Sequence, residues 1–322
     1  MRHVFSKKPP ITGQRVAIVR QRAETGTHQR RRTDGPAMLE NLPFFNRLAL
    51  AAHRPAAIAR AAATLAVQPV DPCWGNGSVF WESALPLQNL LNMPKRRLSG
   101  PVKEVKDAAW QVLNALVSEQ TVHEEHFDLR RLGGLVHSAE FADQDFTSLE
   151  QLASSPLAAD YRVNSYGDFM QVLGRAFSAV GTASFLELYQ ASWQGDLLLW
   201  GFSKGGLAMA SAVTYARAHE LEQSVPANIH QLHLNHEGLN ELETQFICLL
   251  LEKKLFAEKP LVQLLAEHHV LYARLVLSTD PKHPDLLMLP RSSAPAQAVG
   301  EGLLQAGATA MGDCLRACSK PH

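Results

Sequence analysis

Ser203 stands in a local sequence that is typical of a reactive serine. It is the central residue of GFSKG, residues 201–205, between an apolar segment at 197–200 and a segment of helical periodicity at 207–221. Glycine on both sides permits a tight strand-to-helix turn, which leaves a serine hydroxyl exposed at the edge of a sheet. The N-terminus of the following helix would stabilise a developing oxyanion. The spacing therefore predicts a nucleophile for an ester or acyl-transfer reaction.

This stretch resembles the nucleophile elbow of the α/β-hydrolase superfamily. The resemblance implies an acid and a histidine base, which follow the serine in that order along the chain. Glu237 comes just after a predicted strand at 229–234, and His283 comes just after a predicted strand at 272–278. In this hypothesis Ser203 attacks the substrate, His283 removes its proton and Glu237 orients the imidazole.

Other residues and another interpretation stay open for this stretch. Asp280 is an alternative acid, and His268 and His269 are alternative bases. The superfamily's oxyanion loop often carries a His-Gly dipeptide, which this sequence lacks. In a second, non-catalytic interpretation of this stretch, the two glycines relieve backbone strain in a turn and Ser203 caps the helix. We therefore favour an uncharacterised, non-catalytic interaction module, with a serine hydrolase as the alternative.

Histidines and cysteines give no pattern that predicts a metal or cofactor site. His230, His233 and His236 recur every third residue, but on a strand the first two point to opposite faces, so they cannot share one ion. No phosphate-binding loop or dinucleotide fingerprint occurs in the sequence. The four cysteines show no disulfide framework and are expected to be reduced thiols, with Cys248 in a core.

The N-terminal 32 residues differ in charge from the rest of the chain. They contain nine Lys or Arg and one acid, a net charge of +8, and since the whole chain is neutral the remaining residues carry −8. Such an arm could contact nucleic acid or anionic lipid weakly and without sequence preference. A solvated tail, or an upstream extension with the natural start at Met38, explains the same charges.

Composition and element order predict the fold class. With 322 residues, 46% of them hydrophobic, the chain can form one large or two smaller globular domains. It has no apolar run that would span a membrane and no signal peptide, so we expect a soluble cytoplasmic protein of bacterial type. Helical periodicity at 99–119 and 165–181, followed by alternating strands and helices, predicts an α/β or α+β fold with one sheet in its C-terminal half.

The predicted organisation has three parts: a basic arm at 1–37, a helix-rich region at 38–190, and an α/β region at 191–322 that is separate from the second part or forms one domain with it. Beyond the elbow, the segments SGPVKEVKDAAW, ADYRVNSYGDF and LPRSSAPAQAVGEGLL resemble a functionally uncharacterised family of bacterial proteins. That resemblance implies no activity.

Overall fold

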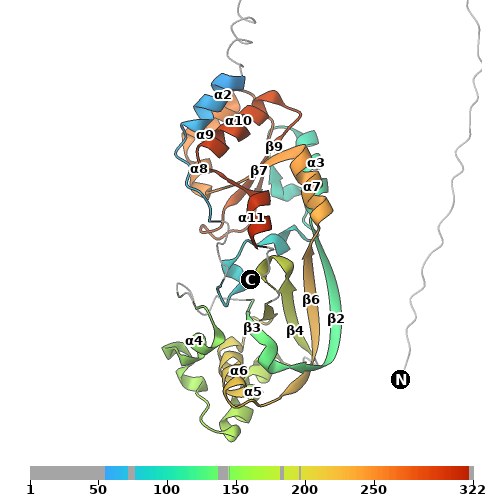
Figure 1. The fold of residues 1–322 in the computed structure, drawn as a ribbon, viewed down its shortest axis with the longest axis vertical. Coiled ribbons are helices and arrows are strands. Elements are labelled where there is room, and N and C mark those ends of the chain that lie inside the picture. The colour runs from blue at the N-terminus through green and yellow to red at the C-terminus, as the bar shows by residue number, and fades with distance from the viewer. Residues whose placement is uncertain are drawn as a thin grey trace, which may run out of the picture. The chain divides into compact units, whose positions relative to one another are not determined.

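Two five-stranded sheets with helices packed against them make up the structure, a computed structural model (Figure 1). It describes residues 55–71, 77–136, 144, 146–181, 185–195 and 197–318. The mixed α and β class predicted from the sequence is confirmed, although the strands form two sheets and not one. The basic arm at 1–37 and Cys73 lie outside the described residues.

The first sheet is mixed, with parallel and antiparallel neighbours. Its strands, in spatial order, are β2 (Val117–Asp128), β6 (Ser224–Leu234), β4 (Leu186–Ala191), β5 (Leu198–Trp200) and β3 (Leu132–Leu135). One face packs against α4 (Leu149–Ser154), α5 (Tyr166–Val180) and α6 (Gly206–Ala218). Buried Trp200, Phe127 and Phe169 are the largest side chains of this core.

The second sheet is antiparallel throughout its described pairs. Its strands, in spatial order, are β1 (Leu98–Ser99), β8 (Ala273–Val276), β9 (Asp285–Pro290), β7 (Phe246–Leu251) and β10 (Thr309–Ala310). One face is covered by α2 (Pro55–Ala63), α8 (Lys253–Ala257), α9 (Lys259–Glu267) and α10 (Ala294–Gln305). The other face packs with α3 (Lys103–Asn114), α7 (His236–Gln245) and α11 (Met311–Cys318).

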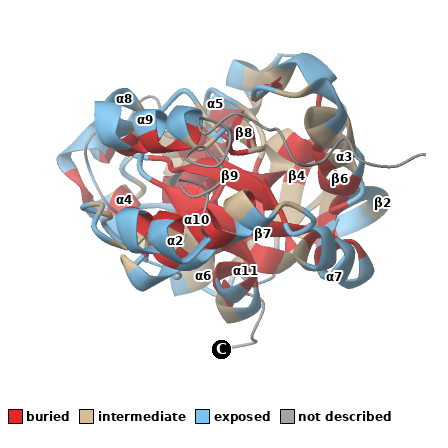
Figure 2. Ribbon diagram, turned by 90° about the horizontal axis from the view of Figure 1, so that it is seen from above, coloured by how far each residue is buried: buried red, intermediate tan, exposed pale blue. Residues whose placement is uncertain are grey.

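Strand β7 shows why the sequence FICLLL is apolar at every position. Successive side chains of a strand point to opposite faces, so a strand covered on both sides needs apolar residues throughout. Ile247 and Leu249 belong to the core under α2 and α10, whereas Cys248 and Leu250 belong to the core shared with the first sheet. Figure 2 shows β7 and β9 buried, with exposed outer faces on α8 and α9. The prediction that Cys248 lies in a core is confirmed.

Short 3-10 segments connect these elements: η1 (Trp81–Ser83), η2 (Leu87–Leu90), η3 (Lys95–Arg97), η4 (Leu129–Arg131), η6 (Pro156–Tyr161) and η7 (Ser192–Gln194).

No helix in the described part of the chain is long and apolar enough to cross a membrane. The positions of the two long predicted helices are confirmed by α3 and α5, and the side chain of Ser165 caps α5.

The prediction of a helix up to residue 119 was wrong at its C-terminal end. Helix α3 ends at Asn114, and Val117 begins the long strand β2. Strand β2 is polar because it lies at the edge of the sheet, where charged side chains discourage pairing with other chains. Its register with β6 runs from Val117 opposite Leu234 to Asp128 opposite Ser224. The described part of region 38–190 thus supplies three strands of the first sheet.

Candidate functional site

Ser203 lies exposed in the turn between β5 and α6. The predicted strand, turn and helix around it are confirmed. Ser203 does not cap the helix, and that part of the structural interpretation was wrong. The capping position of α6 is Gly205, which has a left-handed φ of 78° and no side-chain cap.

Both glycines of the turn have a packing reason that does not involve catalysis. A Cβ at Gly201 would lie 2.6 Å from the carbonyl oxygen of Glu187 on the neighbouring strand. A Cβ at Gly205 would lie 2.9 Å from the carbonyl oxygen of Ala176 on α5. Because real Cβ atoms are not found this close to backbone oxygens, glycine lets β5 and α6 pack tightly against their neighbours.

The structure does not bring Glu237 to Ser203. The backbone N–H of Gly201 donates to the carbonyl of Glu187, and Glu187 lies opposite Asn228 of β6. From Asn228 the strand continues to Leu234 before α7 begins, which is roughly 20 Å at the rise of a β-strand. Glu237, exposed in the first turn of α7, therefore lies at the opposite end of the first sheet from Ser203.

His283 belongs to the second sheet, in the loop between β8 and β9. It is 5% exposed, and its Nε2 donates to the carbonyl oxygen of Glu82 at 2.9 Å. Burial lowers the pKa of His283, with the hydrogen bond to Glu82 acting in the other direction. In this arrangement the imidazole fastens the η1 segment to the loop, and its Nε2 is not directed at a serine.

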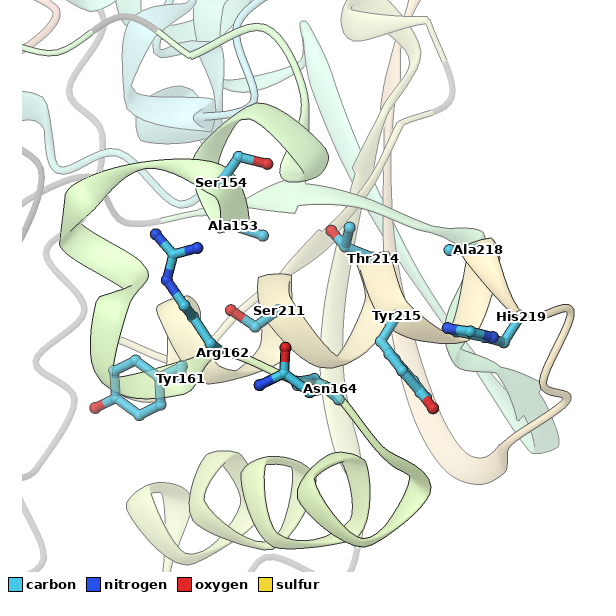
Figure 3. A pocket seen from close by; sticks show the side chains of 11 residues that line it. Ala153, Ser154, Tyr161, Arg162, Asn164, Ser211, Thr214, Tyr215, Ala218 and His219 are labelled. Atoms are coloured by element: carbon cyan, nitrogen blue, oxygen red, sulfur yellow. The ribbon is translucent and has the colours of Figure 1, made fainter.

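A polar cavity of about 350 Å³ lies beside α6, between that helix and residues 153–164. We call it the α6 pocket. Figure 3 shows Ser211 and Thr214 on the face of α6 that is turned toward the chain segment carrying Arg162 and Asn164. Its size falls in the range of small-molecule sites. Two residues that carry hydroxyl groups therefore form part of the wall of a space large enough for a ligand.

Two hydroxyls in this pocket have no hydrogen-bond partner among the described residues. They are Oγ of Ser211, a residue that is 6% exposed, and Oγ1 of Thr214. Helical serines and threonines commonly donate to the carbonyl four residues earlier. Ser178 of α5 does so at 2.7 Å, but Ser211 and Thr214 do not. The hydrogen-bonding capacity of these two buried hydroxyls is therefore not used by any described group.

The chain matches a family of unknown function, DUF6685, over residues 122–320, more than half of its length. The chain belongs to the DUF6685 family. Searches of curated proteins and of solved structures gave no match. The predicted resemblance to a functionally uncharacterised family is confirmed, and the part that matches DUF6685 includes every residue that lines the α6 pocket.

The sequence contained a signal for this pocket that we did not use. Ser211, Thr214, Tyr215 and Ala218 are spaced i, i+3, i+4 and i+7, and therefore lie on one face of a helix. Most other residues of α6 are buried, with Met209, Ala212 and Val213 among its core residues. Ser211, Thr214 and Tyr215 place polar groups on one face of a helix that is mostly apolar, which indicates a face that meets something other than the core.

A second cavity, of about 380 Å³, lies near the start of β9 and is lined by Lys253, Lys254 and Lys282 among others. One of its cations is already engaged, because Lys253 Nζ donates to the carbonyl oxygens of Ser278 and Asp280. Lys253 thus holds the loop after β8 in place. Because its charge is used internally, this cavity is the weaker candidate for a binding site.

His230 is held between two carboxylates on the face of the first sheet opposite α4, α5 and α6. Its Nδ1 lies 2.8 Å from Glu119 and its Nε2 lies 2.7 Å from Glu187. Carboxylate oxygens only accept hydrogen bonds, so both ring nitrogens must carry hydrogen and the imidazole is cationic. Tyr189 stacks on the ring at 4.7 Å. With both nitrogens donating, His230 is neither a proton acceptor nor a metal ligand in this arrangement.

We expect the His230 cluster to make stability depend on pH. Burial acts to lower the pKa of His230, but the hydrogen bonds that its imidazole donates to Glu187 and Glu119 outweigh this effect and raise the pKa above 6.5. A raised pKa stabilises the fold below the pKa of the unfolded chain, and this contribution is lost as the pH rises through the folded value. His230→Gln should therefore lower the free energy of unfolding by about 1 kcal/mol near pH 6 and by less at pH 8.5, as measured by urea unfolding.

His233→Gln is the control for this prediction. His233 lies exposed on the other face of the same strand, so its replacement should change stability little. A cost of His230→Gln that stays constant between pH 6 and pH 8.5 would contradict the charged imidazole.

Proposed function

We propose that this protein is a non-catalytic module that binds a small polar molecule in the α6 pocket. The observation that carries the proposal is the pair of buried hydroxyls, Ser211 and Thr214, which no described protein group satisfies. A buried polar group without a hydrogen bond costs about 1–3 kcal/mol. Such a group therefore needs an explanation, and a bound molecule that supplies the missing partner is the one we propose.

Binding without reaction is the function that the positions of the possible catalytic groups support. His219 also lines the pocket, but it follows Ser211 by more than two helical turns, which places it about 12 Å away along the axis of α6. That distance is too long for a serine and its base. The serine hydrolase hypothesis is weaker still, because Glu237 and Ser203 lie at opposite ends of the first sheet.

The double variant Ser211→Ala/Thr214→Val should bind less well and yet be no less stable than the natural protein. It removes both unpartnered hydroxyls and nearly preserves the shape of the pocket. We expect the free energy of unfolding to rise by about 1 kcal/mol, because buried groups without protein partners are replaced by apolar ones. In a thermal-shift screen of small neutral, cationic and anionic compounds, those that raise the Tm of the natural protein should fail to raise that of the variant.

Ser155→Ala is a matched control on the neighbouring segment. Ser155 is also buried, but its hydroxyl donates to the carbonyl of Leu152 at 2.7 Å. Its replacement should lower stability by about 1 kcal/mol and leave ligand binding intact. The proposal is wrong if no compound raises the Tm of the natural protein, or if the double variant responds to the same compounds equally well.

A further inference from the structure

The α6 pocket carries positive charge. Among the described residues that line it there is no Asp or Glu, whereas Arg162 is one of them. Figure 3 shows the Arg162 side chain extending along the pocket toward α4. Its guanidinium makes no ion pair with another described residue, in contrast to Arg217, which pairs with Glu150 at 2.6 Å. A ligand in this pocket therefore meets a cation that has no carboxylate partner among the described residues.

Two acids on the helices beside the pocket, Glu150 and Asp168, are engaged with other groups. Glu150 on α4 accepts from Arg217, which also donates to the carbonyl oxygens of Arg130 and Leu132. Asp168 on α5 accepts from the backbone N–H of Asn164 at 3.1 Å. Neither carboxylate forms an ion pair with Arg162: Glu150 is paired with Arg217, and Asp168 accepts from a backbone N–H.

Hydrogen-bond donors surround the same space. A guanidinium presents five N–H donors in a planar fork that matches carboxylate and phosphate oxygens. The hydroxyls of Ser211 and Thr214 can donate to further oxygens, and the Asn164 side chain extends toward Ser211 in Figure 3. A cation together with several neutral donors is the chemistry that recognises an oxyanion.

The cavity is larger than one inorganic ion requires, and part of its wall is aromatic. Tyr161 and Tyr215 are half-buried, and the Tyr215 ring is held between Phe169 at 5.8 Å and His219 at 4.2 Å. We propose that the pocket takes a small organic oxyanion, a carboxylate or a phosphate monoester, with its charged group on Arg162 and its remainder against the tyrosines. This inference rests on the proposed function and names its ligand class.

The test compares small probes that share a phenyl ring and differ in the charge of the attached group. Benzoate and phenyl phosphate are the anions, benzamide is the neutral match of benzoate, and benzylamine is the cation. Binding to the full chain is followed by titration in NMR spectra. The anions should bind at least tenfold more tightly than benzamide and benzylamine, and Arg162→Gln should weaken the anions about tenfold or more without affecting benzamide. Arg96→Gln, an exposed arginine on η3, is the control that removes the same charge elsewhere.

The outcomes separate the ligand class from the proposed function. A larger effect of Arg162→Gln on benzoate than on phenyl phosphate assigns the site to carboxylates, and the reverse assigns it to phosphate monoesters. Equal binding of benzamide and benzoate, or no binding of either anion at millimolar concentration, overturns the oxyanion inference. In those cases the proposed function still stands if other compounds bind and the Ser211→Ala/Thr214→Val variant loses them. If the double variant loses none, the proposed function fails as well.

Discussion

Replacing Arg274 by methionine should destabilise the fold by about 3–5 kcal/mol, because it leaves a buried carboxylate without its counter-charge. Asp285, the first residue of the central strand β9, has no exposed surface. Arg274 Nε donates to Asp285 Oδ2 at 2.9 Å, and a second guanidinium nitrogen binds the same oxygen. The other carboxylate oxygen has no partner among the described residues. The variant's free energy of unfolding in urea gives the measurement.

The double variant Arg274→Met/Asp285→Leu distinguishes a buried unpaired charge from a loss of packing. Arg274 also packs over the ring of Phe256 at 4.0 Å, and methionine keeps much of that contact. If the missing counter-charge causes the loss, replacing Asp285 as well should restore most of the stability. A single variant within 1 kcal/mol of the natural protein, or a double variant as unstable as the single one, would show that this ion pair is not what the fold depends on.

Local patterns in the sequence predicted most of the elements but not their assembly. Helical periodicity located α5, and the apolar segment at 197–200 located β5. The division into two sheets was not predictable in this way, because strand pairing depends on contacts between residues far apart in sequence. Strand β2 was missed for a related reason: its sequence VSEQTVHEEHFD has few apolar residues, since an edge strand does not need them.

The candidate site was predicted less well than the fold, and the reason lies in topology. The elbow around Ser203 was located correctly as a strand, turn and helix. Glu237 follows a strand, as an acid should, but β5 and β6 run in opposite directions, so the C-terminal ends of these strands lie at opposite edges of the sheet. Whether a strand runs parallel or antiparallel to its neighbours cannot be read from the sequence of that strand alone. The α6 pocket depends equally on the position of residues 153–164, which no local pattern fixes.

Gly205→Ala should lower the free energy of unfolding by about 2–4 kcal/mol and weaken ligand binding at the α6 pocket. Two effects add: alanine is strained at a φ of 78°, and its Cβ would press on the carbonyl of Ala176. The strain can be relieved only by moving the N-terminus of α6 away from α5, and α6 carries Ser211 and Thr214. Urea unfolding and the probe titrations measure the two consequences.

Three other substitutions separate the causes of the stability loss expected for Gly205→Ala. Gly307 has a φ of 99° and open space at its Cβ, so Gly307→Ala should show the backbone strain alone, about 1–2 kcal/mol. Gly174, within helix α5, also has open space, and its replacement by alanine should stabilise by up to about 1 kcal/mol. Exposed Ser203→Ala should stay within about 0.5 kcal/mol of the natural protein. A Gly205→Ala variant no less stable than Gly307→Ala would mean that tight packing of α6 on α5 is not why glycine stands in this turn.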